Sequence, residues 1–437
     1  MPDSSQSTTG ATTLASAGAQ GRADAPGLPM TSGGRVSSRL MWGLAAGHGV
    51  KHFCQNAWLI LMPEVRAAFL LSDVAVGGIF AAQQIASGVT NVPAGILTDM
   101  FRRRVALMLT LSMLSVATGY FLIAVSQSYW MIVLAGAVMA TGASWWHSPA
   151  IASLATRYPE KRGLAVAMHL TGAQAGDTIS PVVTGLLLGG LSFWAIEWSG
   201  LSWRVVAFIV VVPAAVTSVT VMVLMGKGAV AEKRISLRQY ARTSARLARN
   251  GRVLGMTGVH ALRGAAHSSF VVFLVIYMND VLGYSKQAQG AHIALLTVAG
   301  IASTPFMGRL SDRIGRRPVI VTAMSIGTAL MFTFLWADEG AGLAVALGLL
   351  GIVLFAVMPI IAAAAMDATE KGSEGTSTAL LFAGGSAIGA VAPLIAGAIN
   401  QSAGFHGVVW FAAGLSASGA LLAFVVPAVK RQATSAH

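Results

Sequence analysis

Long apolar segments separated by short polar breaks run along almost the whole chain after its first 38 residues. A bilayer has a hydrocarbon core ~30 Å thick, which an α-helix of about 20 apolar residues can cross. Membrane β-barrels would instead show short segments of alternating polarity. The pattern predicts an all-α integral membrane protein with twelve transmembrane helices, near residues 41–62, 74–97, 104–125, 129–154, 163–189, 203–225, 253–279, 287–308, 318–336, 341–365, 376–400 and 407–428.

The composition supports this prediction. Of the 437 residues, 55% are hydrophobic and only 10% are charged, whereas soluble domains carry about 25% charged residues. The net charge of +13 could suggest nucleic-acid binding, but the Lys and Arg residues cluster in the short breaks between apolar segments. Positive charge in such breaks orients a chain in the membrane. We therefore expect a lipid bilayer and a small-molecule substrate as partners, and no nucleic acid.

The breaks alternate between strongly and weakly basic. Arg and Lys concentrate at 102–104, 157–162, 227–252 and 309–317. Because basic loops stay on the cytoplasmic side, we expect both termini to be cytoplasmic. In the segment 227–252, Arg residues recur at helical spacing, which predicts a basic helix on the cytoplasmic leaflet. A solvated linker whose charge only directs topology is the alternative.

Five regions follow from these patterns. Residues 1–38 are rich in Ser, Thr, Gly and Ala and predict a disordered cytoplasmic tail. Residues 39–226 form a first six-helix bundle, 227–252 the linker, 253–430 a second six-helix bundle and 431–437 a short tail. The single cysteine, Cys54, excludes a disulfide within the chain.

The second half of the chain repeats the first at a shift of 212 residues. This shift pairs His48 with His260, Lys51 with Arg263, Gln55 with His267, Pro93 with Pro305, Gly172 with Gly384, Pro181 with Pro393 and Gly185 with Gly397. A one-residue insertion then pairs Gly95 and Asp99 with Gly308 and Asp312. One offset that links three pairs of spans indicates a duplication. Two related bundles around a midplane site are a transporter design.

A charged loop motif occurs in both halves. GRLSDRIGRR (308–317) contains Gly, three residues, Asp, a basic residue, any residue, Gly and two basic residues. It resembles the signature loop between the eighth and ninth helices of the major facilitator superfamily. GILTDMFRRR (95–104) repeats it with Met100 in place of the basic residue and Arg102 in place of the second Gly. TGAQAGDTISPVVTG (171–185) partly resembles the antiporter motif of the fifth helix.

The resemblance covers about residues 40–430 and implies the major facilitator fold, with two pseudo-symmetric six-helix bundles. It further implies a monomeric carrier in a cell inner (plasma) membrane, with no cofactor. Neither a GxxxxGKS nucleotide motif nor a hydrolase motif occurs in the sequence, so we expect neither ATP drive nor enzyme activity. The GHGVKHF segment (47–53) resembles the fosmidomycin-resistance branch. The basic residues Lys51 in the first span and Arg263 in the seventh resemble the basic pair of the organophosphate exchangers.

The resemblance also implies a gating role for the two charged loops. The gating residues would be Gly95, Asp99, Arg103, Arg104, Gly308, Asp312, Arg313, Gly315, Arg316 and Arg317. A carboxylate at a helix end can pair with Arg and cap a neighbouring helix. Such contacts can lock helix ends together in one state and release them in another. A turn with topology-directing charge is the alternative.

Polar side chains interrupt the first span. His48, Lys51, His52 and Gln55 have the spacing i, i+3, i+4 and i+7, which places them on one helix face. At 1.5 Å per residue, Lys51 lies roughly 15 Å deep, near the bilayer midplane. A Lys there costs about 2.5–3.5 kcal/mol. The resemblance implies that helices one and seven face one another across a central cavity.

Two fixed cations, Lys51 and Arg263, would share one acid inside the spans, Asp177. Leaving both cations unpaired would cost about 5–7 kcal/mol, which water and an anionic substrate would reduce. We therefore expect a small organic, phosphorylated or phosphonate anion as substrate. Its binding residues would be Lys51, Arg263, His48, His52, Gln55, His260, His267 and His169. The alternative is structural, with Lys51 paired to Asp177 and Arg263 bound to backbone carbonyls.

Asp177 is also the first candidate for proton coupling, because an acid in a membrane cavity can bind and release protons. Other functions stay open at this point. An apolar cavity would suit a multidrug proton antiporter. The i, i+4 pair His48 and His52 could serve a transition-metal transporter, although Lys51 and Arg263 would repel a cation. A non-transporting receptor on the same fold is the last alternative.

The fourth span contains SWWHSPA (144–150). Its aromatic residues predict an interfacial anchor, with a stacking wall or gate as the alternative. Pro149 and Pro359 predict paired kinks. Gly-rich stretches in the fifth and eleventh spans predict close helix packing.

Overall fold

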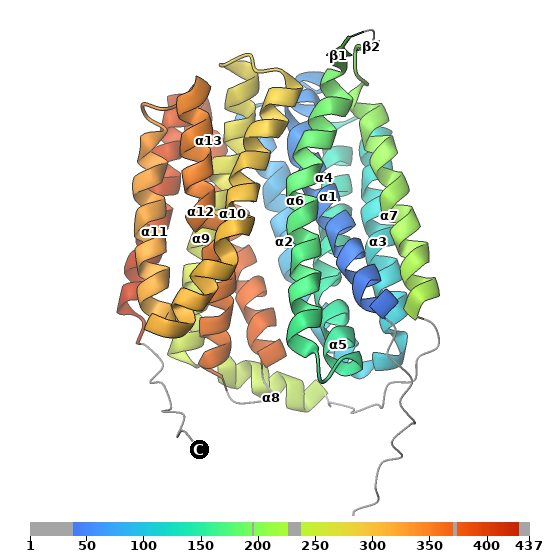
Figure 1. Cartoon of the computed structure of the whole chain (residues 1–437), viewed down its shortest axis with the longest axis vertical. Coiled ribbons are helices and arrows are strands. Elements are labelled where there is room, and N and C mark those ends of the chain that lie inside the picture. The colour runs from blue at the N-terminus through green and yellow to red at the C-terminus, as the bar shows by residue number, and fades with distance from the viewer. Residues whose placement is uncertain (1–37, 195, 226–236, 370–373, 428–437) are drawn as a thin grey trace, which may run out of the picture. The chain divides into compact units, whose positions relative to one another are not determined.

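The computed structural model describes residues 38–194, 196–225, 237–369 and 374–427 (Figure 1). The helices of the first half are α1 (Ser38–Ala68), α2 (Asp73–Met100), α3 (Val105–Ala124), α4 (Tyr129–Trp145), α5 (His147–Arg157), α6 (Arg162–Gly189) and α7 (Trp203–Met225). They are followed by α8 (Leu237–Leu247), α9 (Gly251–Asp280), α10 (Lys286–Ile314), α11 (Arg316–Thr333), α12 (Gly340–Asp367) and α13 (Glu374–Val425). All twelve predicted spans fall on these helices.

Two spans differ from the simplest expectation. The fourth is divided into α4 and α5 at Trp146, three residues before Pro149, whose ring clashes with the carbonyl of the residue four positions earlier. The eleventh and twelfth are both contained in α13, which bends at Gly404 with φ +67°. Because a left-handed φ costs glycine nothing, Gly404 can reverse the chain between two spans. Pro359 lies inside α12, and this helix continues past it from Gly340 to Asp367 without a division.

Six helical segments among the described residues are long and apolar enough to cross a membrane by length and composition alone. They are Arg102–Ala124, Trp203–Met225, Gly251–Asp280, Lys286–Ile314, Gly340–Asp367 and Ala379–Val425. α1 is not among these segments, because polar residues such as His48 and Lys51 lower the mean hydropathy of its interior. Both of these side chains are buried within the protein. The polarity of α1 is therefore directed into the protein.

The contacts between helices repeat in the two halves. α1 packs on α6 as α9 packs on α13, and α2 packs on α4 as α10 packs on α12. Between the halves, α6 contacts α10 and α2 contacts α13. This arrangement agrees with the duplication predicted from the sequence. We call α1–α7 the N-half and α9–α13 the C-half.

Two structural features mark opposite ends of the helices. α8 lies at one end, and a hairpin of β1 (Leu191–Phe193) and β2 (Ile196–Trp198) lies at the other (Figure 1). The sequence did not predict this hairpin. α8 lies within the predicted basic linker, and the contact of this linker with a membrane stays a prediction. Of the predicted tails, only Ser38 lies within the described residues, and it begins α1.

Glycines allow the two halves to meet at the hairpin end. A Cβ on Gly185 in α6 would lie 2.4 Å from the carbonyl oxygen of Lys286 in α10. Its repeat partner Gly397 in α13 would meet the carbonyl oxygen of Asp73 in α2, also at 2.4 Å. Such distances are far below van der Waals contact, so only glycine permits these approaches. The duplicated sequence thus builds two equivalent seams between the halves.

Ion pairs tie the same end. Arg66 at the end of α1 contacts Asp280 at the end of α9 and lies 2.9 Å from Asp73. Lys286 Nζ lies 2.5 Å from Glu64 Oε1. The contacts Arg66–Asp280 and Lys286–Glu64 each join the N-half to the C-half. The hairpin end of the protein is therefore closed.

Candidate substrate-binding site

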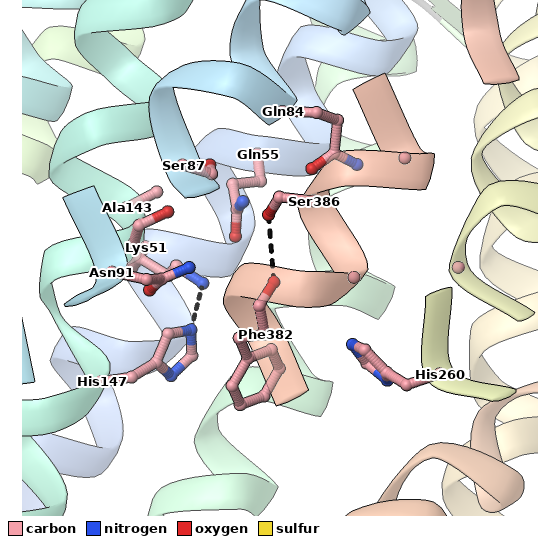
Figure 2. A pocket seen from close by; sticks show the side chains of 14 residues that line it. Lys51, Gln55, Gln84, Ser87, Asn91, Ala143, His147, His260, Phe382 and Ser386 are labelled. Carbon is pink, nitrogen blue, oxygen red and sulfur yellow. Dashed lines mark hydrogen bonds between the residues drawn. The ribbon is translucent and has the colours of Figure 1, made fainter. Parts of the chain in front are cut away.

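A cavity of about 170 Å³ lies between the N-half and the C-half (Figure 2). The N-half contributes Lys51, Gln55, Gln84, Ser87, Asn91, Ala143, Ser144 and His147. The C-half contributes His260, Gly264, Phe382, Gly385, Ser386 and Gly389. One wall is thus rich in amide and hydroxyl groups, and the other combines small residues with an aromatic ring and an imidazole.

Close packing of α1 against α6 positions the polar face of α1. A Cβ on Gly172 would lie 2.0 Å from the carbonyl oxygen of Ala45, and one on Gly176 would lie 2.0 Å from that of Gly49. The predicted close packing of the fifth span is confirmed here. Because the backbones almost touch, Asp177, which follows Gly176, lies directly beside α1.

The ammonium group of Lys51 is buried among imidazoles. Its Nζ lies 3.1 Å from His147 Nε2 and 3.4 Å from His52 Nε2, and the residue is only 3% exposed. An ammonium has donors only, so both Nε2 atoms accept from it. Among the residues that the structure describes, Lys51 forms no ion pair with a carboxylate. The alternative in which Lys51 pairs directly with Asp177 is therefore not observed.

His52 connects Lys51 to Asp177. Since its Nε2 accepts from Lys51, its Nδ1 carries the proton and donates to Asp177 Oδ1 at 2.8 Å. Asn56 Nδ2 donates to the same oxygen at 2.6 Å. The ammonium, the imidazole and the carboxylate therefore form one continuous hydrogen-bonded chain from α1 to α6.

Two further histidines pack beside this hydrogen-bonded chain, His48 against His52 and His169 against His48. The rings of His48 and His169 stack, with centroids 3.9 Å apart and an angle of 11° between planes. His48 Nδ1 donates to the carbonyl of His169 at 2.9 Å, and His169 Nδ1 donates to that of Leu44 at 3.2 Å. Both Nε2 atoms are buried without a hydrogen-bond partner in the described structure. With His52 and His147 they form a cluster of four histidines. His48 and His169 are not among the described residues that line the cavity.

The C-half does not mirror this arrangement. Arg263 donates from Nη2 to the carbonyl of Leu354 in α12 at 2.6 Å, and its buried Nε has no partner among the described groups. Arg263 and His267 are not among the described lining residues, and the ring of His267 packs against Phe355. Of the predicted C-half residues, only His260 lines the cavity. In this conformation Lys51 lines the cavity, whereas Arg263 binds a backbone carbonyl, as the structural alternative predicted.

The second charged loop ties helices of the C-half. Arg316 Nη1 lies 2.5 Å from Asp312 Oδ1, and Arg316 Nε lies 3.3 Å from Asp367 Oδ2 at the end of α12. Gly315 has φ +103°, which only glycine adopts without strain and which turns α10 into α11. Arg317 donates to the carbonyl of Phe424 in α13. The motif thus links α10, α11, α12 and α13.

The other predicted gating residues lie in the last two turns of α2 and α10 and in the short helix that follows α2. Arg103 and Arg104 lie in a short 3₁₀-helix (Arg102–Arg104), and Arg104 stands 5.8 Å over the ring of Phe101. Gly95 lies within α2, and the side chain of Asp99 lies outside the described part of the structure. Gly308 lies within α10 with no atom near its Cβ position, and Arg313 forms part of the last turn of that helix.

Sequence analysis missed His147, the closest partner of Lys51. The prediction of an interfacial aromatic anchor is wrong for the adjacent Trp146, which is fully buried against Gly47 of α1. His147 is the first residue of α5 and lines the cavity. The stacking-wall alternative fits better, since His147 lies parallel to Phe382 with centroids 6.0 Å apart. The sequence did contain a signal for this role, because His147 is a polar residue inside the predicted span 129–154.

The family model of the Major Facilitator Superfamily matches residues 44–257 and 256–437. The chain belongs to the Major Facilitator Superfamily. This confirms the predicted fold class of two pseudo-symmetric six-helix bundles, and it confirms a multi-pass membrane transporter rather than an enzyme.

Individual relatives agree with this assignment. The chain is 23% identical over 296 residues to the fosmidomycin resistance protein of Escherichia coli, covering 66% of this chain and 69% of the relative. It is 25% identical over 363 residues to a chloramphenicol efflux pump of Mycobacterium tuberculosis, covering 78% and 83%. The predicted resemblance to the fosmidomycin-resistance branch is thus confirmed.

Solved structures show the same fold. A bacterial homolog of the human lysosomal transporter Spinster, in an inward-facing and occupied conformation, superposes with a TM-score of 0.71 at 14% identity and covers 89% of this chain and 96% of its own. A D-xylose–proton symporter superposes with a TM-score of 0.71 at 16% identity and covers 90% and 99%. At these identities the likeness establishes the fold.

Proposed function

We propose that this transporter moves a small organic, phosphorylated or phosphonate anion by alternating access, with the anion bound next to Lys51. The observation that supports this proposal is a buried ammonium that faces a cavity and contacts two imidazoles. Neutral imidazoles solvate an ammonium but do not neutralise it. A charge buried in this way is costly unless an anion accompanies it.

The remaining lining suits an anion that carries hydrogen-bonding groups. Gln55, Gln84 and Asn91 offer amide donors, and Ser144 offers a hydroxyl donor, whereas the hydroxyl of Ser386 donates to the carbonyl of Phe382. Charge-assisted hydrogen bonds to a carboxylate or phosphonate are about twice as strong as neutral ones. His260 can add a donor from the C-half. We propose that Arg263 and His267 serve in this state to hold α9 against α12.

We further propose that Asp177 couples transport to protons. The chain Lys51–His52–Asp177 gives a proton on the carboxyl group a direct route to the substrate site. Protonation of Asp177 would remove the acceptor that holds His52 Nδ1–H. The imidazole could then turn and weaken its bond to Lys51, which changes how firmly the ammonium holds an anion. Binding of anion and proton would thus be linked at one site.

For orientation, we propose a cell inner (plasma) membrane with the α8 end at the cytoplasm and both termini on that side, as the basic breaks suggest. With the hairpin end closed by Arg66–Asp280 and Lys286–Glu64, the structure would then represent a state open to the cytoplasm. We propose that the charged loops at the α8 end regulate the opposite closure, with the carrier working as a monomer.

Multidrug efflux is the second candidate, favoured by relatives whose names include fosmidomycin resistance and chloramphenicol efflux pump. Thermal unfolding of the purified protein with panels of organic anions, phosphonates and lipophilic cations separates the two candidates. A ligand at a hundred times its Kd stabilises the folded state by about 2.7 kcal/mol. Stabilisation by anions supports the proposal, and stabilisation by lipophilic cations alone overturns it. Uptake into sealed vesicles then distinguishes a carrier from a receptor that binds without flux.

A further inference from the structure

We propose that His48, His52 and His147 form a binding site for a transition-metal ion of the Zn²⁺, Ni²⁺ or Cu²⁺ class, and that this ion competes with the ammonium of Lys51 for the same imidazole nitrogens. The proposed ion is a ligand of these three imidazoles and not the transported substrate.

The three imidazoles converge from two helices. One ring nitrogen from each of His48, His52 and His147 lies within 4.8 Å of those of the other two. Two nitrogen ligands about 2.1 Å from one tetrahedral ion lie roughly 3.4 Å apart. Each pair therefore has to close by no more than roughly 1.4 Å, which rotation of the side chains can supply. The ring contacts His48–His52 at 4.7 Å and His48–His147 at 5.1 Å confirm that the rings already touch.

Two of the rings are oriented as metal-binding histidines are. A ligating His commonly donates its second ring N–H to a carboxylate or a backbone carbonyl, which fixes the tautomer and leaves the other nitrogen free to bind. His52 donates from Nδ1 to the carboxylate of Asp177, and His48 donates from Nδ1 to the carbonyl of His169. In both rings Nε2 is thereby left as the ligand atom.

The Nε2 atom of His48 supplies an independent observation. His48 is only 2% exposed, and its Nε2 has no hydrogen-bond partner among the described groups. A buried polar atom without a partner costs about 1–3 kcal/mol. A metal ion held jointly with His52 and His147 would satisfy this atom.

Lys51 occupies the place that such an ion would take. Its ammonium contacts the Nε2 atoms of His52 and His147, two of the three ligand residues. Both a metal ion and an ammonium need the same lone pairs, so they cannot bind together. The long, flexible side chain of Lys51 lines the cavity and can swing into it, releasing the imidazoles. The fixed charge of Lys51 would keep the metal affinity of the wild-type chain low.

Ligand chemistry selects the class of ion. Imidazole nitrogen suits Zn²⁺, Ni²⁺ and Cu²⁺, whereas Mg²⁺ and Ca²⁺ prefer oxygen ligands. Three histidines with an open fourth position are a known zinc arrangement. Mg²⁺ therefore serves as the negative control ion.

Calorimetric titration of the purified full-length chain with ZnCl₂ and NiCl₂, in the absence of any substrate, tests the site. The Lys51→Met variant keeps an unbranched side chain, one heavy atom shorter, and removes the competing charge, so it should bind Zn²⁺ at least about ten-fold more tightly than wild type. His147→Gln in the Lys51→Met background should abolish the gain. His406→Gln, which alters an exposed histidine in α13, should leave it unchanged.

Equal Zn²⁺ affinity of wild type and Lys51→Met, or retention of the gain in Lys51→Met/His147→Gln, would overturn the proposal. Visible absorption of bound Co²⁺ provides a readout besides affinity, because a tetrahedral nitrogen site has a distinctive spectrum. A folded Lys51→Met protein without that spectrum would also overturn it. Because no substrate is present, failure here is separate from failure of anion transport.

Discussion

The Nδ1 atom of His52 in α1 lies 2.8 Å from the Oδ1 atom of Asp177 in α6. This contact places the one acid that sequence analysis found inside the spans at the far end of a chain that begins at Lys51. The carboxylate therefore stabilises the ammonium through an imidazole rather than by direct pairing. An imidazole between the two charges can relay a proton from one to the other, because it has one nitrogen that donates and one that accepts.

Replacing Asp177 by Asn should separate substrate binding from proton coupling. The amide cannot carry the negative charge or take up a proton, while His52 keeps a neighbour of the same shape. We expect proton-driven accumulation in vesicles to fall by roughly ten-fold or more, the effect of losing about 1.4 kcal/mol of coupling. Exchange of labelled for unlabelled substrate without a proton gradient should persist. If accumulation survives in Asp177→Asn, this carboxyl group is not the coupling residue.

Replacing Gly397, where α13 packs closely against α2, by a larger residue should open the hairpin end. Gly397→Leu places a side chain against the carbonyl oxygen of Asp73, 2.4 Å from the Cβ position, and overpacking of this kind costs about 1–3 kcal/mol. Amide hydrogen exchange in the first turns of α2 and α10 should therefore accelerate. Gly348→Leu in α12 is the matched control, because no atom lies within 4 Å of its Cβ position. Equal exchange in both variants would contradict closure by this seam.

Loss of the ion pairs of Arg66 should also open the hairpin end, by removing an electrostatic attraction between the two halves. Arg66→Gln leaves Asp73 and Asp280 without their shared cation, so the closed hairpin end should be populated less. Distances between spin labels on α2 and α10 measure this change. Arg204→Gln is the control, since the hydrogen bonds of Arg204 to described residues stay within its own half, at the carbonyls of Ala124 and Ser126. An unchanged distance distribution in Arg66→Gln would show that the pairs do not hold the halves together.

A contact between loop and helix in the C-half predicts a pH dependence of stability. Burial acts to raise the pKa of Asp338, but hydrogen bonds from His406 and Tyr277 outweigh it and hold the pKa below its ordinary value. A carboxyl group with a lowered pKa stabilises the folded state above its unfolded pKa of about 3.9, and this stabilisation is lost as the pH falls through the folded pKa.

Asp338→Asn should therefore lower the apparent Tm at pH 7 by roughly 1 °C, the shift that accompanies a loss of about 1 kcal/mol in a chain of 437 residues. The difference from wild type should shrink as the pH is lowered below about 4. Thermal unfolding in detergent across this range checks the result. A difference that stays constant with pH would show that ionisation of Asp338 is not responsible.

The sequence predicted the helices and the polar face of α1 well, for a simple physical reason. A hydrocarbon core requires long apolar helices, so the spans are visible as apolar segments, and the residues that break this rule mark the interior. His48, Lys51 and His52 are such residues, and all three belong to the observed cluster.

The partner of Lys51 could not be predicted in the same way. Sequence spacing makes Asp177 as plausible a partner as any histidine, because it does not say how far α6 lies from the tip of a long side chain. In the structure the nearest described partner of Lys51 is instead His147, the first residue of α5. Pro149 predicted a kink but not its direction.

The internal repeat also predicted more symmetry than the site has. Lys51 and Arg263 occupy equivalent positions, but the guanidinium group of Arg263 donates to the carbonyl of Leu354, whereas Lys51 lines the cavity. A guanidinium has several donors in a planar fork and can use a backbone carbonyl that a compact ammonium would not reach. Equivalent backbone positions thus acquired different environments.

The central claim is that Lys51 holds an anionic substrate, and anion affinity of Lys51→Gln measured by calorimetry tests it most directly. Charge-assisted hydrogen bonds contribute about 1.5–3 kcal/mol, so we predict a loss of roughly 10- to 150-fold in Lys51→Gln for the anion that stabilises the wild type best. Arg263→Gln, which alters a cation outside the described cavity lining, should lose much less. Unchanged anion affinity in a folded Lys51→Gln protein would contradict the account.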